Sequence, residues 1–508
     1  MADVSVAVAE GLGYPRRLRV CVLCSSYEGS ESELKAFDDL QQTPQWHVPE
    51  NDPDMTFETV QIKKATSYRT IRALVKSGMY DVFYNQCDGA KDEDRAGEDV
   101  VHALEEFRVP FTASTSKYYE LSKPDMKMLA HYAHIPTAAF AVIERSSEVR
   151  ERCSSLQFPV IIKHICGYSS IGMTKDCKCY TMEELENRAE RFIKEYQSAL
   201  VEEFITGDEV TVLACADQTQ PDGIRVFHPV MVKFPTGDDF KHFDLKWQAF
   251  DDMGWLRVPN DDPALQQMLN ITRTSFREMM GGIGYGRCDL RIDRVNNRAI
   301  FLEINPNCGI MYPPGQESSA DWILKLAPDM NHRDFALLQI REALARNVRE
   351  ALLYRVDYDT KRGYHLRAAT KIPEGRVVFQ DEGKYFRVVT RPYVEKHWSA
   401  SDREAFALGA WPLGSDRHYY AIWDHDPKMW RSFNHSCEPN LAFDDARSLN
   451  VTALRDIEPN EELTMDFRTF SDDAMKPFTC HCNTSSCAGR IEPKQPRLSP
   501  IKFQRALQ

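Results

Sequence analysis

The sequence has no long apolar run, no basic start followed by an apolar stretch, and no internal repeat. A bilayer-spanning helix needs about 20 consecutive apolar residues, and no run in these 508 residues approaches that length. The opening stretch, MADVSVAVAEGLGYPRR, does not have the pattern of a secretory signal. We therefore expect an intracellular protein, cytoplasmic or nuclear, with no membrane partner.

The sequence also lacks a positive charge balance. Its 63 Lys and Arg residues face 76 Asp and Glu residues, a formal net charge of −13, which argues against a large nucleic-acid surface. In a reducing compartment, its 14 cysteines are more often buried thiols or metal ligands than disulfides. The length exceeds what one hydrophobic core supports, so we expect three or four units.

The pattern of apolar and polar residues changes twice along the chain. From about 17 to 345, apolar runs such as RVCVLC, YDVFYN, VTVLACA and AIFLEI alternate with helix-like segments, which predicts an α/β fold. Residues 331–355 have apolar residues at helical spacing and predict a connecting helix. After 356, short runs broken by Gly, Pro, Asp and Asn indicate a small, mostly β domain.

The stretch FPVIIKHICGYSSIGM (158–173) predicts a buried strand followed by a phosphate-binding lid. The strand ends at Lys163, and the loop carries Gly167, Ser169, Ser170 and Gly172. Glycines let backbone N–H groups approach phosphate oxygens, serines add donors, and a lysine neutralises charge. Because the lysine precedes the glycines, this is not a P-loop. Taken alone, the stretch could equally be an ordinary loop between strands.

The stretch GRCDLRIDRVNNRAIFLEINPN (286–307) predicts a hairpin around Asn296 and Asn297. If the hairpin is symmetric about Asn296, Asp289 lies opposite Glu303 and Arg287 opposite Asn305. Facing carboxylates repel each other unless a cation lies between them, and oxygen ligands suit Mg²⁺. The alternative is a solvated, exposed strand face, which the apolar run AIFLEIN disfavours.

Residues 17–330 resemble an ATP-grasp ligase of the D-alanine–D-alanine ligase branch. The resemblance rests on an ordered set of segments: DVFYNQCDGAKDED, LSKPDMKMLAHYAHIPTAAF, PVIIKHICGYSSIGM, LVEEFITGDEVTV, FDLKWQ, GYGRCDLRID and FLEINPNCG. It implies phosphate contacts from Lys123, Lys163 and Lys246, and a lid containing Ser169 and Ser170. It also implies an adenine-binding hinge formed by Glu202, Glu203, Phe204 and Ile205, with Glu209 as the ribose ligand. Arg287 would stabilise the oxyanion. Two Mg²⁺ ions would be bound by Asp289, Glu303 and Asn305.

The family's chemistry joins a small carboxylate to an amine. The carboxylate attacks the γ-phosphate of ATP to give an acyl phosphate, and the amine then displaces phosphate. Three departures affect the substrate side. The segment IMYPPGQ (310–316) has prolines where a serine is expected, Asp88 lies where a histidine is expected, and Trp247 replaces a tyrosine. The resemblance therefore implies a complete ATP half-site and a rebuilt substrate half-site.

The segment FTCHCNTSSCAGRI (478–491) predicts a metal site. Cys480, Cys482 and Cys487 have C-x-C-x4-C spacing, and three thiolates need a fourth ligand for tetrahedral Zn²⁺. Cys437 in RSFNHSCEPN (431–440) is the candidate. The alternative is a set of structural thiols without a metal.

Together with NEELTMDF (460–467), these segments resemble a SET domain of protein lysine methyltransferases with its post-SET zinc segment, over about 354–491. The resemblance implies that S-adenosyl-L-methionine contacts Asn434 and His435, near the strand end at Gly363 and His365. It also implies a lysine-containing protein partner such as a histone.

Two departures put methyl transfer in question. Phe467 replaces the tyrosine that closes the family's ELTxDY signature, which removes a positioned hydroxyl; Tyr419 and Tyr420 are candidates to replace it. The family's GxG at the strand end reads Gly363-Tyr364-His365, which adds a bulky side chain where backbone should approach the cofactor.

We therefore expect an α/β N-terminal domain (17–115), an ATP-grasp domain (116–330), a connecting helix (331–353), a mostly β SET domain (354–477), a zinc segment (478–491) and a basic tail (492–508). The leading hypothesis is a ligase fused to an active methyltransferase. A rival is a ligase whose SET region is a protein-binding module. A third alternative, a nucleotide-sensing pseudoligase that regulates a methyltransferase, is disfavoured by the complete set of ATP-site residues.

Overall fold

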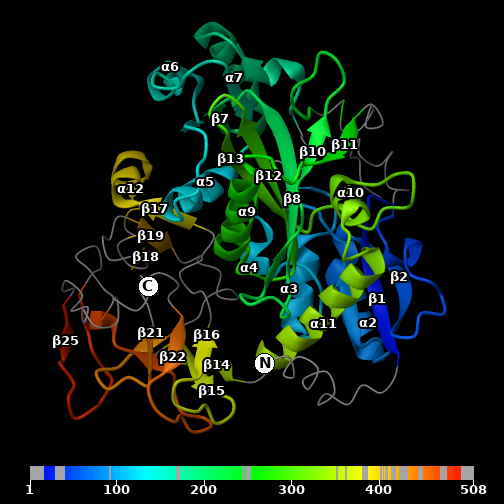
Figure 1. Ribbon diagram of the computed structural model, residues 1–508. Helices are drawn as coiled ribbons and strands as arrows, with labels where there is room; N and C mark the ends of the chain where they lie inside the picture. Colours follow the sequence, from blue (N-terminus) through cyan, green and yellow to red (C-terminus); the bar gives the residue numbers. More distant parts are fainter. Residues whose placement is uncertain are drawn as a thin grey trace. The chain divides into compact units, whose positions relative to one another are not determined.

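The computed structural model divides the chain into two compact units, Met1–Arg349 and Glu350–Gln508 (Figure 1). The described residues are 17–28, 41–90, 93–166, 172–242, 245, 253–350, 353–360, 363–379, 387–400, 403, 406, 410–413, 419–422, 433–443, 450–469 and 477–492.

The N-terminal unit begins with a three-stranded parallel sheet of order β2-β1-β3. The runs RVCVLC and YDVFYN form β1 and β3, as expected from the sequence. Strand β1 is buried along almost its whole length, as a central parallel strand should be. The elements are β1 (Leu18–Ser26), η2 (Pro44–Trp46), β2 (Met55–Lys63), η3 (Lys64–Thr66), α2 (Ser67–Ser77), β3 (Val82–Asn85) and α3 (Glu98–Glu106).

A four-stranded antiparallel sheet of order β4-β7-β5-β6 follows. Helix α7 packs on it, burying apolar side chains such as Leu185 and Phe192 against Val160 and Val201. The elements are α4 (Ser116–Tyr119), α5 (Lys123–Tyr132), β4 (Phe140–Ile143), η4 (Ser146–Glu148), α6 (Val149–Arg152), β5 (Val160–Lys163), η5 (Lys175–Cys177), β6 (Lys178–Cys179), α7 (Met182–Tyr196) and β7 (Ala199–Glu203).

The second antiparallel sheet of this unit has the order β11-β10-β8-β12-β13, with β9 paired to β8. Helix α9 packs against β8, β12 and β13, whereas α10 packs against β8, β10 and β11, and Figure 1 shows them on opposite sides of β8. The elements are β8 (Asp208–Ala216), β9 (Ile224–Val226), β10 (Val230–Lys233), β11 (Gly254–Arg257), α9 (Leu265–Met280), β12 (Tyr285–Asp293), β13 (Arg298–Pro306) and α10 (Ser319–Leu326).

The β12–β13 hairpin has the predicted pairing: Asp289 lies opposite Glu303, and Arg287 opposite Asn305. The hairpin is not symmetric about Asn296 along its whole length. Near the turn Asp293 pairs with Arg298, and an irregularity after Asp289 shifts the register. A bulge adds one residue to one strand, and here it restores the facing pairs on which the site depends.

Helix α11 (His332–Glu350) forms where a connecting helix was expected. Its buried side chains, among them Phe335 and Ile340, share one core cluster with Val20 of β1 and Leu213 of β8. The parallel sheet and the second antiparallel sheet are therefore parts of one packed body. Arg333 adds an ion pair to Asp52, with Nε 2.8 Å from Oδ2. Among the helices of the described residues, none is both long and apolar enough to span a bilayer.

The C-terminal unit is mostly β, as expected. Its main sheet has five strands in the order β16-β22-β21-β23-β20, beside sheets β14-β15, β17-β19-β18 and β24-β25. The elements are β14 (Tyr354–Asp359), β15 (Gly363–Ala368), β16 (Val377–Phe379), β17 (Arg387–Thr390), α12 (Arg391–His397), β18 (Ala410–Leu413), β19 (Tyr419–Ile422), β20 (Asn434–His435), β21 (Leu441–Phe443), β22 (Val451–Ala453), β23 (Thr464–Met465), η7 (Phe467–Thr469), β24 (Phe478–Thr479) and β25 (Arg490–Ile491).

Candidate active sites

A cleft with about 900 Å³ of empty space is lined by strands from both antiparallel sheets of the N-terminal unit. Most of the residues that the sequence assigned to ATP and Mg²⁺ lie around it. The lining includes Lys123, Lys163, Glu202, Glu203, Phe204, Ile205, Glu209, Arg287, Asp289, Glu303 and Asn305. Ser169, Ser170 and Lys246, also expected here, lie outside the described residues.

Asp289 is held by four hydrogen bonds. Its two oxygens accept from Arg287 Nε at 3.0 Å and Nη2 at 2.9 Å, from the Thr211 hydroxyl at 2.9 Å and from Asn305 Nδ2 at 3.0 Å. Burial alone would raise the pKa of Asp289, but Arg287 and Lys241 lower it to about 2. The carboxylate is therefore ionised and fixed in place at neutral pH.

Glu303 faces Asp289 across the hairpin and is paired with Lys123, whose Nζ lies 2.9 Å from Oε2. Burial opposes ionisation of Glu303, but Lys123 and Lys163 hold its pKa below the ordinary value despite the nearby Asp289. Asn305 Nδ2 lies 3.5 Å from Glu303 Oε1. Two ionised carboxylates and an amide thus converge, as the sequence predicted, beside lysine and arginine cations.

A buried ion triad supports Lys163. Glu202 contacts the Lys163 ammonium with one oxygen and Lys127 Nζ, at 2.7 Å, with the other. Lys127, only 1% exposed, also donates to the Thr137 hydroxyl at 2.8 Å and to the Phe301 carbonyl at 3.3 Å. Burial opposes ionisation of Glu202, but the two ammonium groups lower its pKa to about 2. Lys127 thus anchors Glu202, which in turn positions Lys163.

Sequence reasoning missed Lys127, although a signal was present. Lys127 is four residues after Lys123, so both lie on the same face of α5 (Lys123–Tyr132). The spacing of Lys127 from Lys123 therefore indicates that both lysines belong to the same site. A lysine buried in a helix needs a carboxylate partner, and only the fold shows that Glu202 supplies it.

Glu209, the expected ribose ligand, is held between two cations that the sequence did not single out. Lys241 Nζ lies 2.9 Å from Oε1, and Arg291 Nη1 lies 3.3 Å from Oε2. Arg291 and Lys178 both lie over the Phe204 ring of the expected hinge, at 4.5 and 3.8 Å from the ring centroid respectively. The cleft is thus more cationic than the sequence motifs alone indicated.

In the C-terminal unit, β20 lies parallel to β23, pairing Asn434 with Thr464 and His435 with Met465. We refer to this parallel pairing as the β20–β23 crossing. Asn434 Nδ2 donates to Glu462 Oε1 at 2.8 Å. Gly363 and His365, which the sequence analysis expected near the cofactor, both lie in β15. The His365 side chain is buried.

His435 links this crossing to the cysteines. Its Nδ1 accepts the Phe467 backbone N–H at 3.1 Å, so Nε2 carries the proton of the neutral ring and donates to Cys437 Sγ at 3.4 Å. Burial lowers the pKa of His435, which favours that neutral form. The ring of Phe467 packs against His435 and Phe478, with centroids 5.5 and 5.8 Å away respectively.

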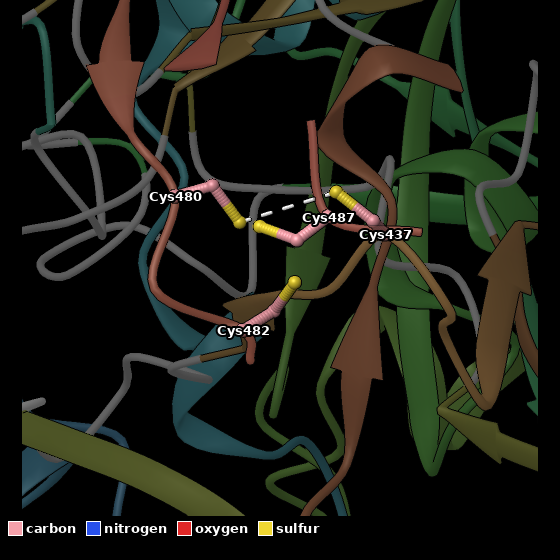
Figure 2. Close-up of side chains that lie close together, drawn as sticks. All are labelled: Cys437, Cys480, Cys482 and Cys487. Atoms are coloured by element: carbon pink, nitrogen blue, oxygen red, sulfur yellow. Dashed lines mark hydrogen bonds between the residues drawn. The ribbon is translucent and has the colours of Figure 1, made fainter. Parts of the chain in front are cut away.

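The sulfur atoms of Cys437, Cys480, Cys482 and Cys487 all lie within 4.8 Å of one another (Figure 2). Cys437 and Cys480 are 4.0 Å apart. Glu438, next to Cys437, accepts from the Ser485 hydroxyl at 2.9 Å and from the Ser486 N–H at 3.1 Å. This contact fastens the Cys482–Cys487 loop to the Asn434–Cys437 segment.

The two candidate replacements for the missing hydroxyl lie in a different sheet from His435. Tyr419 is the first residue of β19, in the sheet β17-β19-β18. The Tyr420 ring is buried in an apolar cluster with Val389 and Val394, and its centroid lies 5.1 Å from that of Phe406. This packing accounts for the burial of the Tyr420 ring.

Two regions of the chain match models of known families. Residues 129–313 match the family model for the D-ala D-ala ligase C-terminus, and residues 363–468 match that for the SET domain. The chain joins a D-alanine–D-alanine ligase-like ATP-grasp region to a SET domain. A four-cysteine cluster follows the SET region.

Among similar proteins, the D-alanine–D-alanine ligase of Alcanivorax borkumensis is 29% identical over 48% of this chain and 72% of its own length. That of Bordetella avium is 28% identical over 48% of this chain and 74% of its own length. The solved structure of the Coxiella burnetii ligase aligns with 66% of this chain and 96% of its own, at 13% identity and a TM-score of 0.49.

The buried triad in the ligase-like region gives a stability prediction. Lys127→Met leaves Glu202 with one ammonium partner, and breaking a buried pair costs about 3–5 kcal/mol. We expect a loss of that size in the free energy of unfolding of the N-terminal transition, measured by urea denaturation at pH 7. The control is Arg150→Met, which removes the exposed pair with Glu186 (2.6 Å); it should cost at most about 1 kcal/mol. Equal losses in the two variants would contradict the anchoring role.

Proposed function

We propose that the N-terminal unit is an ATP- and Mg²⁺-dependent ligase that joins a small carboxylate to an amine through an acyl phosphate. The observation that carries this proposal is the convergence of Asp289, Glu303 and Asn305 with Lys163 and Arg287 around one cleft. The likeness to D-alanine–D-alanine ligases supports the reaction class. This likeness does not identify the acid and the amine that this chain would join, because its substrate-side motifs differ from those of the family.

The donor set fits Mg²⁺ bound together with a nucleotide. Hard oxygen ligands from one or two carboxylates, completed by phosphates, are what Mg²⁺ prefers. Asp289, Glu303 and Asn305 would hold the metal, which when bound would neutralise charge on the transferred phosphoryl group. Glu202 to Ile205 and Glu209 would hold the adenosine portion.

This chain's own cations would then stabilise the charge that develops. Lys123 and Lys163 are paired with carboxylates, so each is fixed in position before a nucleotide arrives. Arg287, held by two hydrogen bonds to Asp289, presents the guanidinium to the cleft. Such preorganised donors need no reorganisation as negative charge builds up on the reacting carboxylate. Ser169, Ser170 and Lys246 remain predictions for the lid and the terminal phosphate.

Glu303→Gln tests the metal assignment. The amide cannot supply the negative charge that Mg²⁺ needs, so ATP-dependent phosphate release should fall at least about a hundredfold while the protein stays folded. Release is measured with a panel of amino acids and small carboxylates. Glu186→Gln, which changes an exposed partner of Arg150 on α7, should leave release unchanged. A folded Glu303→Gln variant with unimpaired release would rule out the assignment.

We propose further that the SET region binds S-adenosyl-L-methionine at Asn434 and His435 and transfers its methyl group to a protein lysine, such as one in a histone. The β20–β23 crossing and the adjoining cysteine cluster support this function. Phe467 supplies no hydroxyl to align the amine, so transfer is slow. The rival function, a protein-binding module beside an active ligase, is favoured by the same residue.

The four thiols fit Zn²⁺. Tetrahedral coordination with Zn–S bonds of about 2.3 Å places sulfur atoms about 3.8 Å apart, close to the 4.0 Å between Cys437 and Cys480. Burial raises the pKa of Cys482, but hydrogen bonds, first among them that of the Thr484 hydroxyl, lower it to about 5. This ligand is therefore ready as a thiolate. When bound, Zn²⁺ would hold the post-SET segment against Cys437 and thereby fix His435.

We expect one zinc per chain and no structural disulfide, measured by elemental analysis of reduced protein. Cys482→Ser leaves three thiolates, so most of the zinc should be lost on dialysis against a chelator, and S-adenosyl-L-methionine affinity should fall. The affinity for ATP should not change, because the ATP residues lie in the other unit. Cys166→Ser, at a thiol in the N-terminal unit, is the control and should keep its zinc. Zinc-free wild-type protein would contradict the site.

Phe467→Tyr separates the enzyme from the module. A single positioned hydroxyl can be worth about 10²–10³ in rate, so we expect the variant to methylate histone at least tenfold faster with labelled cofactor. Calorimetry should show little change in cofactor affinity, because the Phe467 contact to His435 uses the backbone N–H. Phe478→Tyr changes the neighbouring ring and should have no such effect. Wild-type protein that binds no cofactor would leave the binding-module function.

A further inference from the structure

A group of three potential metal ligands lies in the N-terminal unit, apart from the residues to which the proposed functions assign Mg²⁺ and Zn²⁺. It consists of His47, Asp321 and His332, and one ligand atom of each lies within 4.8 Å of the other two. His47 directly follows η2, Asp321 lies in the first turn of α10, and His332 is the first residue of α11. None of the three is among the described residues that line the ATP-type cleft. The proposed functions therefore leave this group unused.

Asp321 is the buried centre of the group, and its two oxygens have different partners. Its side chain is 0% exposed. Oδ2 accepts from the Ser318 backbone N–H at 3.0 Å and from the Ser318 hydroxyl at 2.8 Å, which caps α10. Oδ1 accepts from the Met311 N–H at 2.7 Å and lies 3.1 Å from His332 Nε2. One oxygen thus serves the helix, whereas the other faces a histidine.

His47 has the hydrogen bond that a metal-binding histidine usually makes. Its Nε2 lies 2.8 Å from the Tyr312 carbonyl, which can only accept, so Nε2 carries the proton of the neutral ring and Nδ1 carries the lone pair. Histidines that bind metals usually donate their second ring N–H to a carbonyl or carboxylate in this way. Burial lowers the pKa of His47, and the neighbouring His332 lowers it further, which favours the neutral ring.

The two imidazoles lie close to a coordinating arrangement. An ion with bonds of about 2.1 Å holds neighbouring ligand atoms about 3.0–3.4 Å apart. The 3.1 Å between His332 Nε2 and Asp321 Oδ1 is within that range. The rings of His47 and His332 are stacked, with centroids 4.0 Å apart and planes at 13°. Parallel rings cannot both aim a nitrogen at one ion, so one ring has to turn, and rotation of an imidazole about its Cβ–Cγ bond is soft.

Other histidine–carboxylate pairs of this unit show what an ordinary pair looks like. His102 Nε2 lies 3.6 Å from Glu98 Oε1, and His242 Nε2 lies 3.0 Å from Asp238 Oδ1. Within the described residues, neither pair belongs to a group of three close potential ligands. Each of these pairs joins residues four apart in the sequence, whereas the group around His47 joins three separate segments of the chain.

We propose that His47, Asp321 and His332 bind a divalent transition-metal ion such as Zn²⁺ or Co²⁺, at a site separate from the Mg²⁺ cleft and from the cysteine cluster. Two imidazoles and a carboxylate suit these ions, whereas Mg²⁺ prefers oxygen ligands. With three protein ligands, the site keeps a position for water and exchanges its ion more readily than four thiolates do. Purified protein therefore carries zinc at the cysteines only, and this site fills when metal is added.

The bound ion would fasten the loop that follows β13. The N–H of Met311 donates to Asp321, and the carbonyl of Tyr312 accepts from His47, so both backbone contacts of the loop are made to proposed ligands. The ion would tie this loop to η2 and to the starts of α10 and α11. Because an ion that binds only the folded state shifts the unfolding equilibrium, we expect it to stabilise the N-terminal unit.

The test titrates Co²⁺ into purified, reduced, full-length protein in the presence of excess Mg²⁺, which occupies the carboxylate cleft. Calorimetry should show one equivalent of Co²⁺ bound in addition to the cysteine-bound zinc. The visible spectrum should be that of nitrogen and oxygen ligands, without the charge-transfer absorption of a cobalt thiolate. The bound ion should also raise the midpoint of thermal unfolding of the N-terminal unit.

Histidine variants assign the ion to these side chains. His47→Gln and His332→Gln each keep an N–H donor for the present acceptor but remove the imidazole. Each should weaken Co²⁺ binding at least tenfold, because even the loss of a residue that only supports a ligand costs about 10–100-fold. Circular dichroism checks that both variants are folded. His102→Gln is the matched control, since it removes a histidine beside a single carboxylate, and it should bind Co²⁺ as wild type does.

Variants of the two other sites show that this one is separate. Cys482→Ser and Glu303→Gln should both retain the Co²⁺ bound by nitrogen and oxygen ligands, because neither residue belongs to the group around His47. Binding that shows a thiolate spectrum alone would assign the ion to the cysteine cluster and reject this site.

Two further results would overturn the inference. In the first, the folded wild type binds no Co²⁺ beyond its cysteine site. In the second, His47→Gln and His332→Gln both bind Co²⁺ as tightly as wild type does. Neither result bears on ATP-dependent phosphate release or on S-adenosyl-L-methionine binding, so this inference and the proposed functions fail separately.

Discussion

The pairing of β12 with β13 is the constraint on which the ligase-like site depends. It brings Asp289 and Glu303 face to face, an arrangement that is unfavourable for two bare carboxylates. The protein balances it with Arg287 on one side and Lys123 on the other. Because each cation is itself fixed by a carboxylate, the charges that hold the site together are the same ones to which the proposed function assigns the reaction.

A second set of paired charges lies behind Lys163. Lys163 reaches the cleft because Glu202 holds it, and Glu202 is held in turn by the buried Lys127. Buried ions of this kind contribute little net stability, but removing one partner exposes the full cost of the others. A network of alternating charges therefore holds the side chains that line this part of the cleft.

The C-terminal unit uses sulfur and an imidazole in place of such ion pairs. Its strands β20 and β23 are only two residues long, too short to be stable alone. The contact of His435 with both Cys437 and the Phe467 backbone joins the short crossing to the cysteine cluster. A metal bound by the thiols would thus act directly on His435, to which the proposed function assigns the cofactor contact.

The sequence by itself determined the fold class and the order of the two main regions, and it singled out side chains that the fold brings together, such as Asp289 with Glu303 and the four cysteines. Strand runs such as RVCVLC and AIFLEI, the alternation in the hairpin and the C-x-C-x4-C spacing are local, and local patterns are readable without a structure. Only the tertiary structure decided that Lys127 completes the Glu202 triad and that Lys241 and Arg291 hold Glu209. These contacts join residues that lie on different elements or separate loops, and burial, which decides whether a charge needs a partner, is a property of the packed fold and not of the sequence pattern.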